Sequence, residues 1–217
     1  MKSDRFSLQY PVMRGSIAER VGEYVAALPE RSFVEVRDID GPRGPIESAF
    51  SRLAAKGELW RVRKGLYWKG APTRLGMSRP RREEVALRLG GPGSGPAGVA
   101  ASLWLGVTSQ LPATFVVAVP RRVPSPWRHV RFTQRSVERL LRGLTPSEVA
   151  VLEVLRAGPA IVEGSWDRFG EVVAQLAEDG EVRPAVLRDQ VADEHHSGVR
   201  SRWSQLCDEH PSLLAAA

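Results

Sequence analysis

The chain has 217 residues, 42% of them hydrophobic, and a formal net charge of +6 at pH 7. This composition supports one large or two ordinary folded domains and excludes a disordered polyelectrolyte. No apolar run approaches the roughly 20 residues that span a bilayer, and the start lacks a charged segment followed by an apolar one. The single cysteine, Cys207, excludes an internal disulfide and leaves no cysteine cluster for zinc. We therefore expect a folded cytoplasmic protein without a membrane span.

The basic charge is concentrated in the N-terminal part of the chain. Residues 1–82 carry 17 Lys or Arg against 9 Asp or Glu, whereas residues 83–217 carry 14 against 16. A basic segment attracts polyanions at long range and releases counterions when it contacts phosphates. We expect nucleic acid rather than an anionic membrane as the partner, because no long apolar helix with a basic rim accompanies the charge.

The first predicted helix begins after Ser16, which can cap it, and Glu19 occupies the position at which a capping box has its carboxylate. Pro29 ends this helix. Residues 32–39 have apolar side chains at helical spacing, although they could equally open with a short strand. The glycine and proline residues of 40–44 predict a turn before the next helix.

Residues 44–68, with the sequence GPIESAFSRLAAKGELWRVRKGLYW, predict a helix that leads directly into a basic β-hairpin. The helix begins at Pro45, places apolar residues at i, i+3, i+4 and i+7 spacing, and ends at Lys56-Gly57. The β-prone runs on either side of Lys64-Gly65 form the hairpin. Together they are typical of the recognition helix and wing of a winged helix-turn-helix.

The polar face of this helix and the tip of the hairpin are the predicted DNA-binding site. A recognition helix enters the major groove, where polar side chains meet base edges, while basic wing residues contact the phosphate backbone. The alternative is a surface whose charges are merely solvated, but the hairpin cations come without a carboxylate after Glu58. The predicted contacts are Arg43, Glu47, Ser48, Ser51, Arg52, Lys56, Arg61, Arg63 and Lys64.

The proline, glycine and arginine residues of 69–82 predict a linker, so that a DNA-binding domain covers residues 1–78 and a second domain covers 79–217. The glycine-rich stretch 90–96 lacks the Lys-Ser/Thr of a phosphate-binding loop, and no apolar strand leads into it. We expect a flexible turn there and no nucleotide cofactor. Residues 115–119 predict a buried strand, bracketed by short helices at 81–89 and 99–105 and a second strand at 128–133.

Seven arginines fall between residues 121 and 142, with only Glu138 among them as a carboxylate. This second basic cluster predicts a further nucleic-acid surface or a dock for an acidic partner, and solvated charge is the alternative. The linker arginines could likewise follow a DNA backbone. The auxiliary residues predicted for DNA or a partner are Arg79, Arg81, Arg82, Arg121, Arg122, Arg128, Arg131 and Arg135.

From Thr145 onward the apolar spacing predicts helices, at about 145–155, 166–179, 183–191 and 201–214. The expected fold class is therefore α+β, an N-terminal winged helix-turn-helix followed by a mixed α/β domain that ends in a helical region. Polar residues 193–198 should join two of these helices. The last helices are typical of an interaction module.

Residues with catalytic potential are sparse. His195-His196 beside two acids could bind a metal, but consecutive side chains do not converge on one ion, and an exposed polar turn is the expected structure. Ser102, Ser109 and Ser125 have no nearby histidine in a nucleophile motif, and no paired carboxylates suit acid–base catalysis. We expect no catalytic residue, no cofactor and no metal site, and therefore not an enzyme.

Two segments resemble a known family. The run from Val21 to Trp68, ending RLAAKGELWRVRKGLYW, looks like the N-terminal winged helix of AbiEi-type antitoxins, the transcriptional regulators of type IV toxin–antitoxin operons. Residues 100–120, AASLWLGVTSQLPATFVVAVP, are similar to that family's second-domain signature. The signature combines a small-residue helix, a Leu-Gly-Val/Leu-Thr turn, a Gln-Leu/Val-Pro step and an apolar strand. The two segments cover about a third of the chain, whereas residues 90–96 and the C-terminal helices do not match the family pattern.

The resemblance implies a cytoplasmic antitoxin that binds double-stranded DNA at its own promoter and represses its operon through the N-terminal domain. It also implies that the C-terminal domain opposes a cognate nucleotidyltransferase toxin, directly or indirectly. The alternative is a winged-helix transcriptional regulator with a ligand-sensing or nucleic-acid-processing second domain. A deep polar pocket lined by residues 100–135 would favour that alternative, whereas a shallow basic face would favour the antitoxin.

Overall fold

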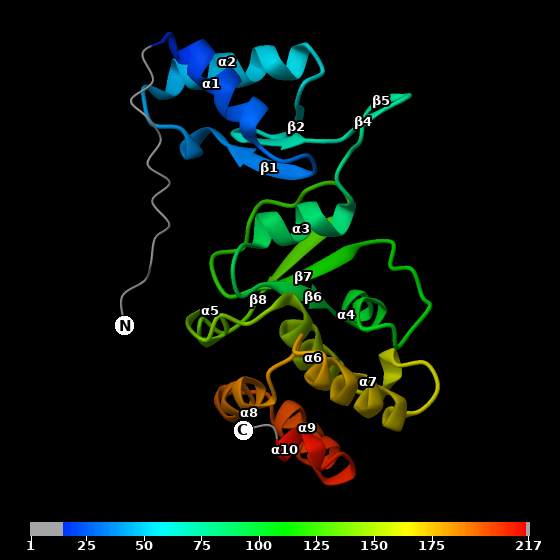
Figure 1. Ribbon diagram of the computed structural model, residues 1–217. Helices are drawn as coiled ribbons and strands as arrows, with labels where there is room; N and C mark the ends of the chain where they lie inside the picture. The colour runs from blue at the N-terminus through cyan, green and yellow to red at the C-terminus, as the bar shows by residue number, and fades with distance from the viewer. Residues whose placement is uncertain (1–14, 216–217) are drawn as a thin grey trace. The chain divides into compact units, whose positions relative to one another are not determined.

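A computed structural model describes residues 15–215 of the chain (Figure 1). The chain forms two compact units, the first ending at Arg81 and the second beginning at Arg82. The sequence analysis placed the boundary after residue 78. Residues 1–14, on which the expectation about a leader depends, lie outside the described residues. Between residues 15 and 215 no helix combines the length and the apolar character needed to cross a bilayer.

Helix α1 (Ile17–Ala27) opens the first unit and is capped as the sequence predicts. The amide of Glu19 donates to the Ser16 hydroxyl, and the Ser16 amide donates to the Glu19 carboxylate at 2.7 Å. At the other end, Lys69 Nζ donates to the carbonyl oxygens of Val25, Ala26 and Leu28 at 2.5–2.9 Å. A cation at this end satisfies carbonyls that have no partner within the helix, so Lys69 ties α1 to the sheet.

Residues 32–39, for which the sequence allowed either a helix or a short strand, contain both. Strand β1 (Ser32–Glu35) pairs with a later strand of the same unit, and a single 3₁₀ turn, η1 (Val36–Asp38), follows it. The Asp38 carboxylate accepts the Glu35 amide at 2.7 Å and closes this turn. The helix that would stand second in a winged helix-turn-helix is therefore reduced to one turn.

Helix α2 (Arg43–Ala55) follows the predicted turn and begins two residues before Pro45, where the sequence analysis placed its start. Proline at the third helical position is accommodated because amides of the first turn have no partner within the helix. One side of α2 buries Ile46, Ala49 and Phe50, as the apolar spacing predicts. The Phe50 ring stacks on Tyr67 of the sheet with centroids 5.0 Å apart, so this face of α2 is fixed on the core.

Strands β2 (Trp60–Arg63) and β3 (Leu66–Lys69) form the predicted hairpin and join β1 in an antiparallel sheet of order β1-β3-β2. The predicted linker is not extended throughout, because a small second hairpin, β4 (Pro72–Thr73) and β5 (Gly76–Met77), occupies part of it. The Thr73 hydroxyl donates to Gly76 O and accepts the Leu75 amide, which fixes the tip of this hairpin.

The second unit contains a three-stranded mixed sheet of order β6-β7-β8, with β7 antiparallel to β6 and parallel to β8. Phe115, Val117 and Val119 of β7 pack on one face with Ala86 of α3, whereas Ala118 packs on the other face with residues of α4 and α6. Both faces of β7 are covered, which explains its uninterrupted apolar sequence. The elements are α3 (Arg82–Gly90), β6 (Gly95–Ala97), α4 (Val99–Trp104), β7 (Phe115–Val119), β8 (Val130–Gln134) and α5 (Glu138–Leu141).

The prediction of a flexible turn at residues 90–96 is wrong in its second half, because Gly95 begins β6. A Cβ atom at Gly95 would lie 2.5 Å from Val149 Cβ and 2.7 Å from Pro146 O. The glycine is needed for β6 to approach the helix that carries these two residues. What looked like flexibility in the sequence is a close-packed contact in the structure.

The rest of the second unit is helical, as predicted. Glu148, fully buried, completes a capping box with Thr145 and accepts hydrogen bonds from Arg183 at 2.7 Å. The last predicted helix starts at Ser197 rather than at residue 201 and is interrupted near Pro211, so the polar joint at 193–198 is shorter than expected. The helices are α6 (Pro146–Ala157), α7 (Trp166–Glu178), α8 (Pro184–Asp193), α9 (Ser197–Glu209) and α10 (Ser212–Ala215), with a 3₁₀ turn, η2 (Pro159–Ile161), after α6.

Candidate nucleic-acid interface

The face of α2 opposite its buried side is exposed and carries the predicted contact residues. Ser48, Ser51, Arg52 and Lys56 are exposed, since the 3.6-residue period that buries Phe50 turns them outward. In the first turn, Arg43 Nε donates to Glu47 Oε1 at 2.7 Å. The structure therefore brings the predicted helix residues together on one accessible face.

The cations of the hairpin are exposed because successive side chains of β2 point to opposite faces of the sheet. Arg61 and Arg63 are exposed on either side of buried Val62, and Lys64 is exposed at the turn. The pairing of β2 with β3 shifts register between Arg61 and Arg63, and such an irregularity changes the direction of side chains at the end of a hairpin. Gly65 has a φ of 79°, a conformation that favours glycine, and it allows the tight return into β3.

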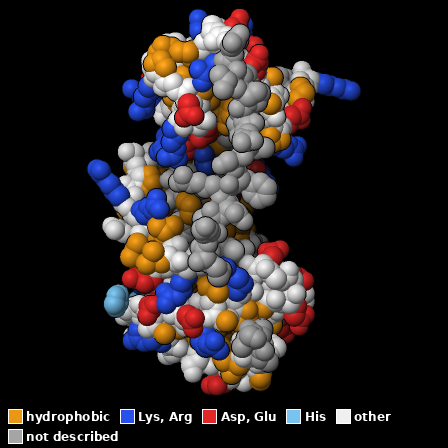
Figure 2. Space-filling model, turned by 60° about the vertical axis from the view of Figure 1, so that its left-hand side comes forward, with side chains coloured by type: hydrophobic (Ala, Val, Ile, Leu, Met, Phe, Trp, Pro, Cys, Tyr) orange, Lys and Arg blue, Asp and Glu red, His pale blue; other side chains and the backbone are white. Residues whose placement is uncertain are grey.

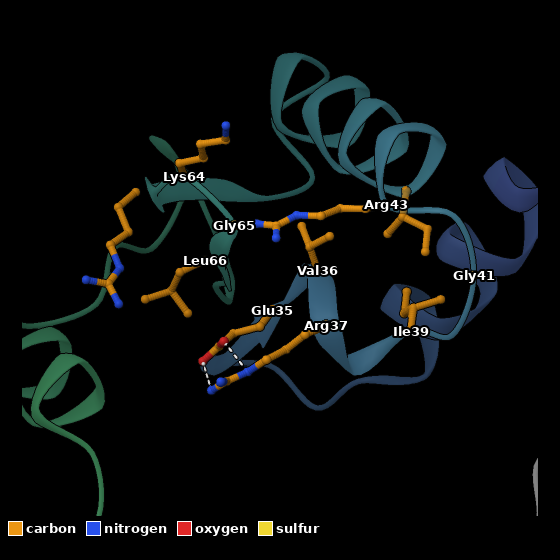
Figure 3. Close-up of a pocket in the computed structure, with 11 residues that line it drawn as sticks. Glu35, Val36, Arg37, Ile39, Gly41, Arg43, Lys64, Gly65 and Leu66 are labelled. Atoms are coloured by element: carbon orange, nitrogen blue, oxygen red, sulfur yellow. Dashed lines mark hydrogen bonds and ion pairs between the residues drawn. The ribbon is translucent and has the colours of Figure 1, made fainter.

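The helix and the hairpin tip enclose a common hollow of about 400 Å³ (Figure 3). Arg43 extends from the first turn of α2 toward Gly65, and Arg63 and Lys64 line the same hollow. Arg37 of η1 also lines it, but its guanidinium is paired with Glu35 at 2.6 Å. The hollow is therefore cationic, and three elements of the first unit meet there.

Most cations of this interface make no hydrogen bond or ion pair within the part of the chain that the structure describes. Over the described range, residues 15–215, no hydrogen bond or ion pair holds the side chains of Arg52, Lys56, Arg61, Arg63 and Lys64. Figure 2 shows Lys and Arg side chains that project from the surface of the first unit. Cations that are exposed and unpaired keep their full charge for an external anion, because no internal carboxylate has to be displaced first.

Two of the auxiliary arginines lie against aromatic rings. The Arg79 guanidinium is 5.6 Å from the centroid of Trp60 in the first unit, and that of Arg128 is 5.1 Å from the centroid of Trp127 in the second. Arg128 adopts a φ of 47°, which is unusual for a residue other than glycine. These guanidinium groups are positioned by stacking and remain accessible, since both residues are exposed.

The other auxiliary arginines differ in their surroundings. Arg121, Arg122 and Arg131 are exposed around the ends of β7 and along β8. Arg82 donates to Pro112 O at 3.3 Å and lies over the Phe115 ring, so it belongs to the packing of the second unit. Arg81 is exposed, at the boundary between the units.

Arg135 is not a free surface cation, contrary to the sequence prediction. Its Nε and Nη2 atoms donate to the two carboxylate oxygens of Glu153 at 2.7 and 2.8 Å. Arg139, which is fully buried, donates to Glu153 at 2.8 Å and to Glu194 at 2.8 Å, and Arg156 donates to Glu194 at 2.5 Å. Two arginines of the predicted basic cluster therefore belong to a buried ion-pair network that joins the end of β8, α5, α6 and the end of α8.

The charges of this network are held by one another. Burial by itself raises the pKa of Glu153, but the hydrogen bond from Arg135 and the charge of Arg139 together outweigh it and lower that pKa below its ordinary value. A hollow beside the network is lined by residues 134–136, Glu138, Arg156 and 194–196. The buried carboxylates already have arginine partners, so the role of the network is structural. The spacing of residues in the sequence did not predict it.

The other candidate chemistry of the sequence does not come together in the structure. Among residues 15–215, no group of three His, Cys, Asp or Glu side chains is arranged to hold a metal ion. Glu194 is committed to arginines, while the adjacent His195 is exposed. Cys207 is buried on α9, and burial raises the pKa of its thiol, which opposes thiolate chemistry.

Comparison with known proteins finds a likeness among solved structures but none among families or curated proteins. No protein-family model matches the chain, and no curated protein matches it. The structure is similar to that of the RV2827C protein from Mycobacterium tuberculosis, with 19% sequence identity over 94% of this chain and 81% of that chain. The TM-score is 0.47. A likeness at this level establishes neither a shared fold nor a shared function.

Proposed function

We propose that the chain is a DNA-binding repressor whose first unit recognises a double-stranded operator at its own promoter. The observation that carries this proposal is the cationic hollow in which Arg43, at the start of α2, meets Arg63 and Lys64 of the hairpin tip. Beside it, exposed cations of α2 and the hairpin make no hydrogen bond or ion pair between residues 15 and 215. In a winged helix, these two elements engage the major groove and the adjacent backbone. The order helix, strand, turn, helix, hairpin and the sheet order β1-β3-β2 suit such an arrangement.

Within this proposal, the two elements have different tasks. Ser48, Ser51 and Arg52 are short or planar donors on the helix face and are suited to base edges. Arg61, Arg63 and Lys64 are exposed, make no hydrogen bond or ion pair among residues 15–215, and are suited to phosphates, which carry no sequence information. The proposed function is therefore binding and not catalysis, in a cytoplasmic protein.

We propose further that the repressor is the antitoxin of a type IV toxin–antitoxin operon, in which the second unit opposes a nucleotidyltransferase toxin. The support is the resemblance of residues 21–68 and 100–120 to the AbiEi-type pattern. The structure is compatible with it, since the second segment forms α4, the following turn and the central strand β7. Exposed Arg121, Arg122 and Arg131 at the edge of this sheet are suited to contact an acidic partner or DNA.

A ligand-sensing or nucleic-acid-processing second domain is the competing hypothesis. The sequence analysis tied it to a deep polar pocket lined by residues 100–135. The hollow found beside the buried network is lined mainly by residues outside that stretch, from α5, α6 and the segment after α8. Glu194, its buried carboxylate, is held by Arg139 and Arg156 rather than free to act on a ligand, so this hollow does not favour the hypothesis.

Replacement of Arg52 by alanine tests the helix face. We expect binding to the promoter duplex to weaken by about 1–3 kcal/mol, the discrimination lost with one bidentate base contact. The fold should not change, because Arg52 is exposed and makes no internal hydrogen bond or ion pair within residues 15–215. Fluorescence titration at fixed salt measures the effect, and unchanged affinity for the promoter would show that this face does not read bases.

Co-expression tests the antitoxin function. The full chain should restore growth to cells that express the nucleotidyltransferase encoded next to it, whereas a fragment of residues 1–81 should bind DNA but not protect. The fragment matches the first compact unit, which has its own hydrophobic core around Val21, Val34 and Phe50. Full rescue by the fragment, or no rescue by the full chain, contradicts the proposed division of labour.

A further inference from the structure

A carboxylate lies within the basic interface. Glu47 is the only Asp or Glu between Arg43 and Lys56, and its side chain is 31% exposed on the outward face of α2. The other polar residues exposed on α2 carry cations or hydroxyl groups. A negative charge beside DNA phosphates is repelled by them, so affinity for a polyanion does not account for this residue.

The carboxylate of Glu47 is compensated by cations from both elements of the interface. Arg43 Nε donates to it at 2.7 Å from one turn earlier on α2. This hydrogen bond is the largest cause of the lowered pKa of Glu47; burial opposes it, and the charges of Arg43, Lys64 and Arg61 add smaller contributions that lower the pKa. Glu47 is therefore ionised at neutral pH, and wing cations offset its charge.

An ionised carboxylate can only accept hydrogen bonds. In the major groove, guanine presents acceptors at N7 and O6, thymine an acceptor at O4, and adenine an acceptor beside its amino group. Cytosine presents the N4 amino donor, which is the group that Glu and Asp contact. A carboxylate on a recognition helix therefore discriminates between bases in a way that a serine or a phosphate-binding cation cannot.

We infer that Glu47 is a specificity-determining residue, which selects cytosine at one position of the operator, and that Arg43 holds its carboxylate in place. This inference rests on the DNA-binding function proposed above. Only Nε of Arg43 is used in the pair, so both Nη groups remain for the guanine opposite that cytosine, for an adjacent base or for a phosphate. The Arg43–Glu47 pair then addresses a G·C base pair as one unit.

The competing explanation is an i,i+4 ion pair that only stabilises α2. Both explanations predict the contact seen between Arg43 and Glu47, but they differ in what happens when the charge is removed. A pair that only stabilises the helix leaves the ranking of DNA sequences unchanged. A carboxylate that reads cytosine changes the ranking at one position.

Selection from a pool of random DNA duplexes separates these explanations. The full chain is compared with Glu47→Gln and with the control Glu58→Gln, which removes a more exposed carboxylate just beyond the C-terminal end of α2. The parent should enrich a motif that contains the selected cytosine. Glu47→Gln should reduce that preference about tenfold or more and shift it toward adenine, whose N6 and N7 suit a glutamine amide. The control should enrich the parental motif.

Affinity for a duplex without the motif provides the second readout. Glu47→Gln should bind it more tightly than the parent, because a repulsive charge is gone, while its discrimination for the motif falls. Circular dichroism verifies that α2 is intact. If Glu47→Gln enriches the parental motif with every preference unchanged, the inference is wrong and the repressor function stands. If the parent itself enriches no motif, sequence-specific repression is contradicted, and the inference is overturned with it.

Discussion

Replacement of Arg61, Arg63 and Lys64 by alanine is expected to weaken DNA binding several hundredfold at 0.1 M salt. Each phosphate contact contributes about 0.9 to the slope of log affinity against log salt concentration, so three lost contacts flatten the slope by about 2.7. The relative preference among DNA sequences should persist, because phosphate contacts carry no base information. The measurement is a titration of operator and unrelated duplexes at salt concentrations from about 0.05 to about 0.2 M, over which the affinity of such complexes changes steeply.

The control for this triple alanine variant, the wing variant, removes the same number of positive charges at other places on the surface. Arg31, Arg74 and Arg188 are exposed and lie outside the proposed interface: after α1, at the tip of the β4–β5 hairpin and on α8. Their joint replacement by alanine should lower affinity only through the weak long-range field and leave the slope nearly unchanged. Equal slopes for the wing variant and the parent would show that the hairpin does not contact DNA.

Replacement of Arg139 by methionine is expected to destabilise the second unit by about 3–5 kcal/mol, the usual cost of removing one partner from a buried ion pair. Arg139 has no exposed surface, and its removal leaves Glu153 and Glu194, each 2% exposed, with one cation fewer. Methionine retains the aliphatic packing, so the loss reports mainly on charge. Urea unfolding of the full chain, monitored by circular dichroism, measures the change in the free energy of unfolding.

Arg142 provides the matched control in the same region. Its side chain is 27% exposed and pairs with Asp193, which is 46% exposed. An exposed pair contributes at most about 1 kcal/mol, so Arg142→Met should shift the unfolding transition far less than Arg139→Met. Similar small effects for both variants would contradict a stabilising role of the buried network.

Patterns of short range are sufficient to predict much of the first unit. The apolar spacing of Ile46, Ala49 and Phe50 defines which face of α2 is buried, and hence which face is available to a ligand. The alternation around Val62 does the same for the hairpin. Ser16 and Glu19 mark the start of α1 because both groups of a capping box are three residues apart in the sequence.

Contacts between residues far apart in sequence decide which arginines of the second basic cluster are neutralised and which are exposed. Arg135 and Arg139 follow exposed cations in the chain and looked like part of one surface, but their carboxylate partners lie 14 to 55 residues later. No local period marks such a partnership. Only the packing of α5 and α6 against the end of α8 shows which arginines are neutralised and which, such as Arg121 and Arg131, remain exposed.

Strand β6 is a second feature that tertiary contacts decide against the preference of its local sequence. Its sequence, Gly95-Pro96-Ala97, has low strand propensity and follows three more glycines in residues 90–94, so local rules favour a turn. Pairing with β7 and the close approach to Val149 decide otherwise, and both are tertiary contacts. The sequence by itself therefore determined most of the helices, the hairpin at residues 60–69 and the polarity of the candidate interface, since these depend on neighbours within a few residues. The tertiary structure alone decided which charges stay free, because neutralisation depends on side chains that folding brings together.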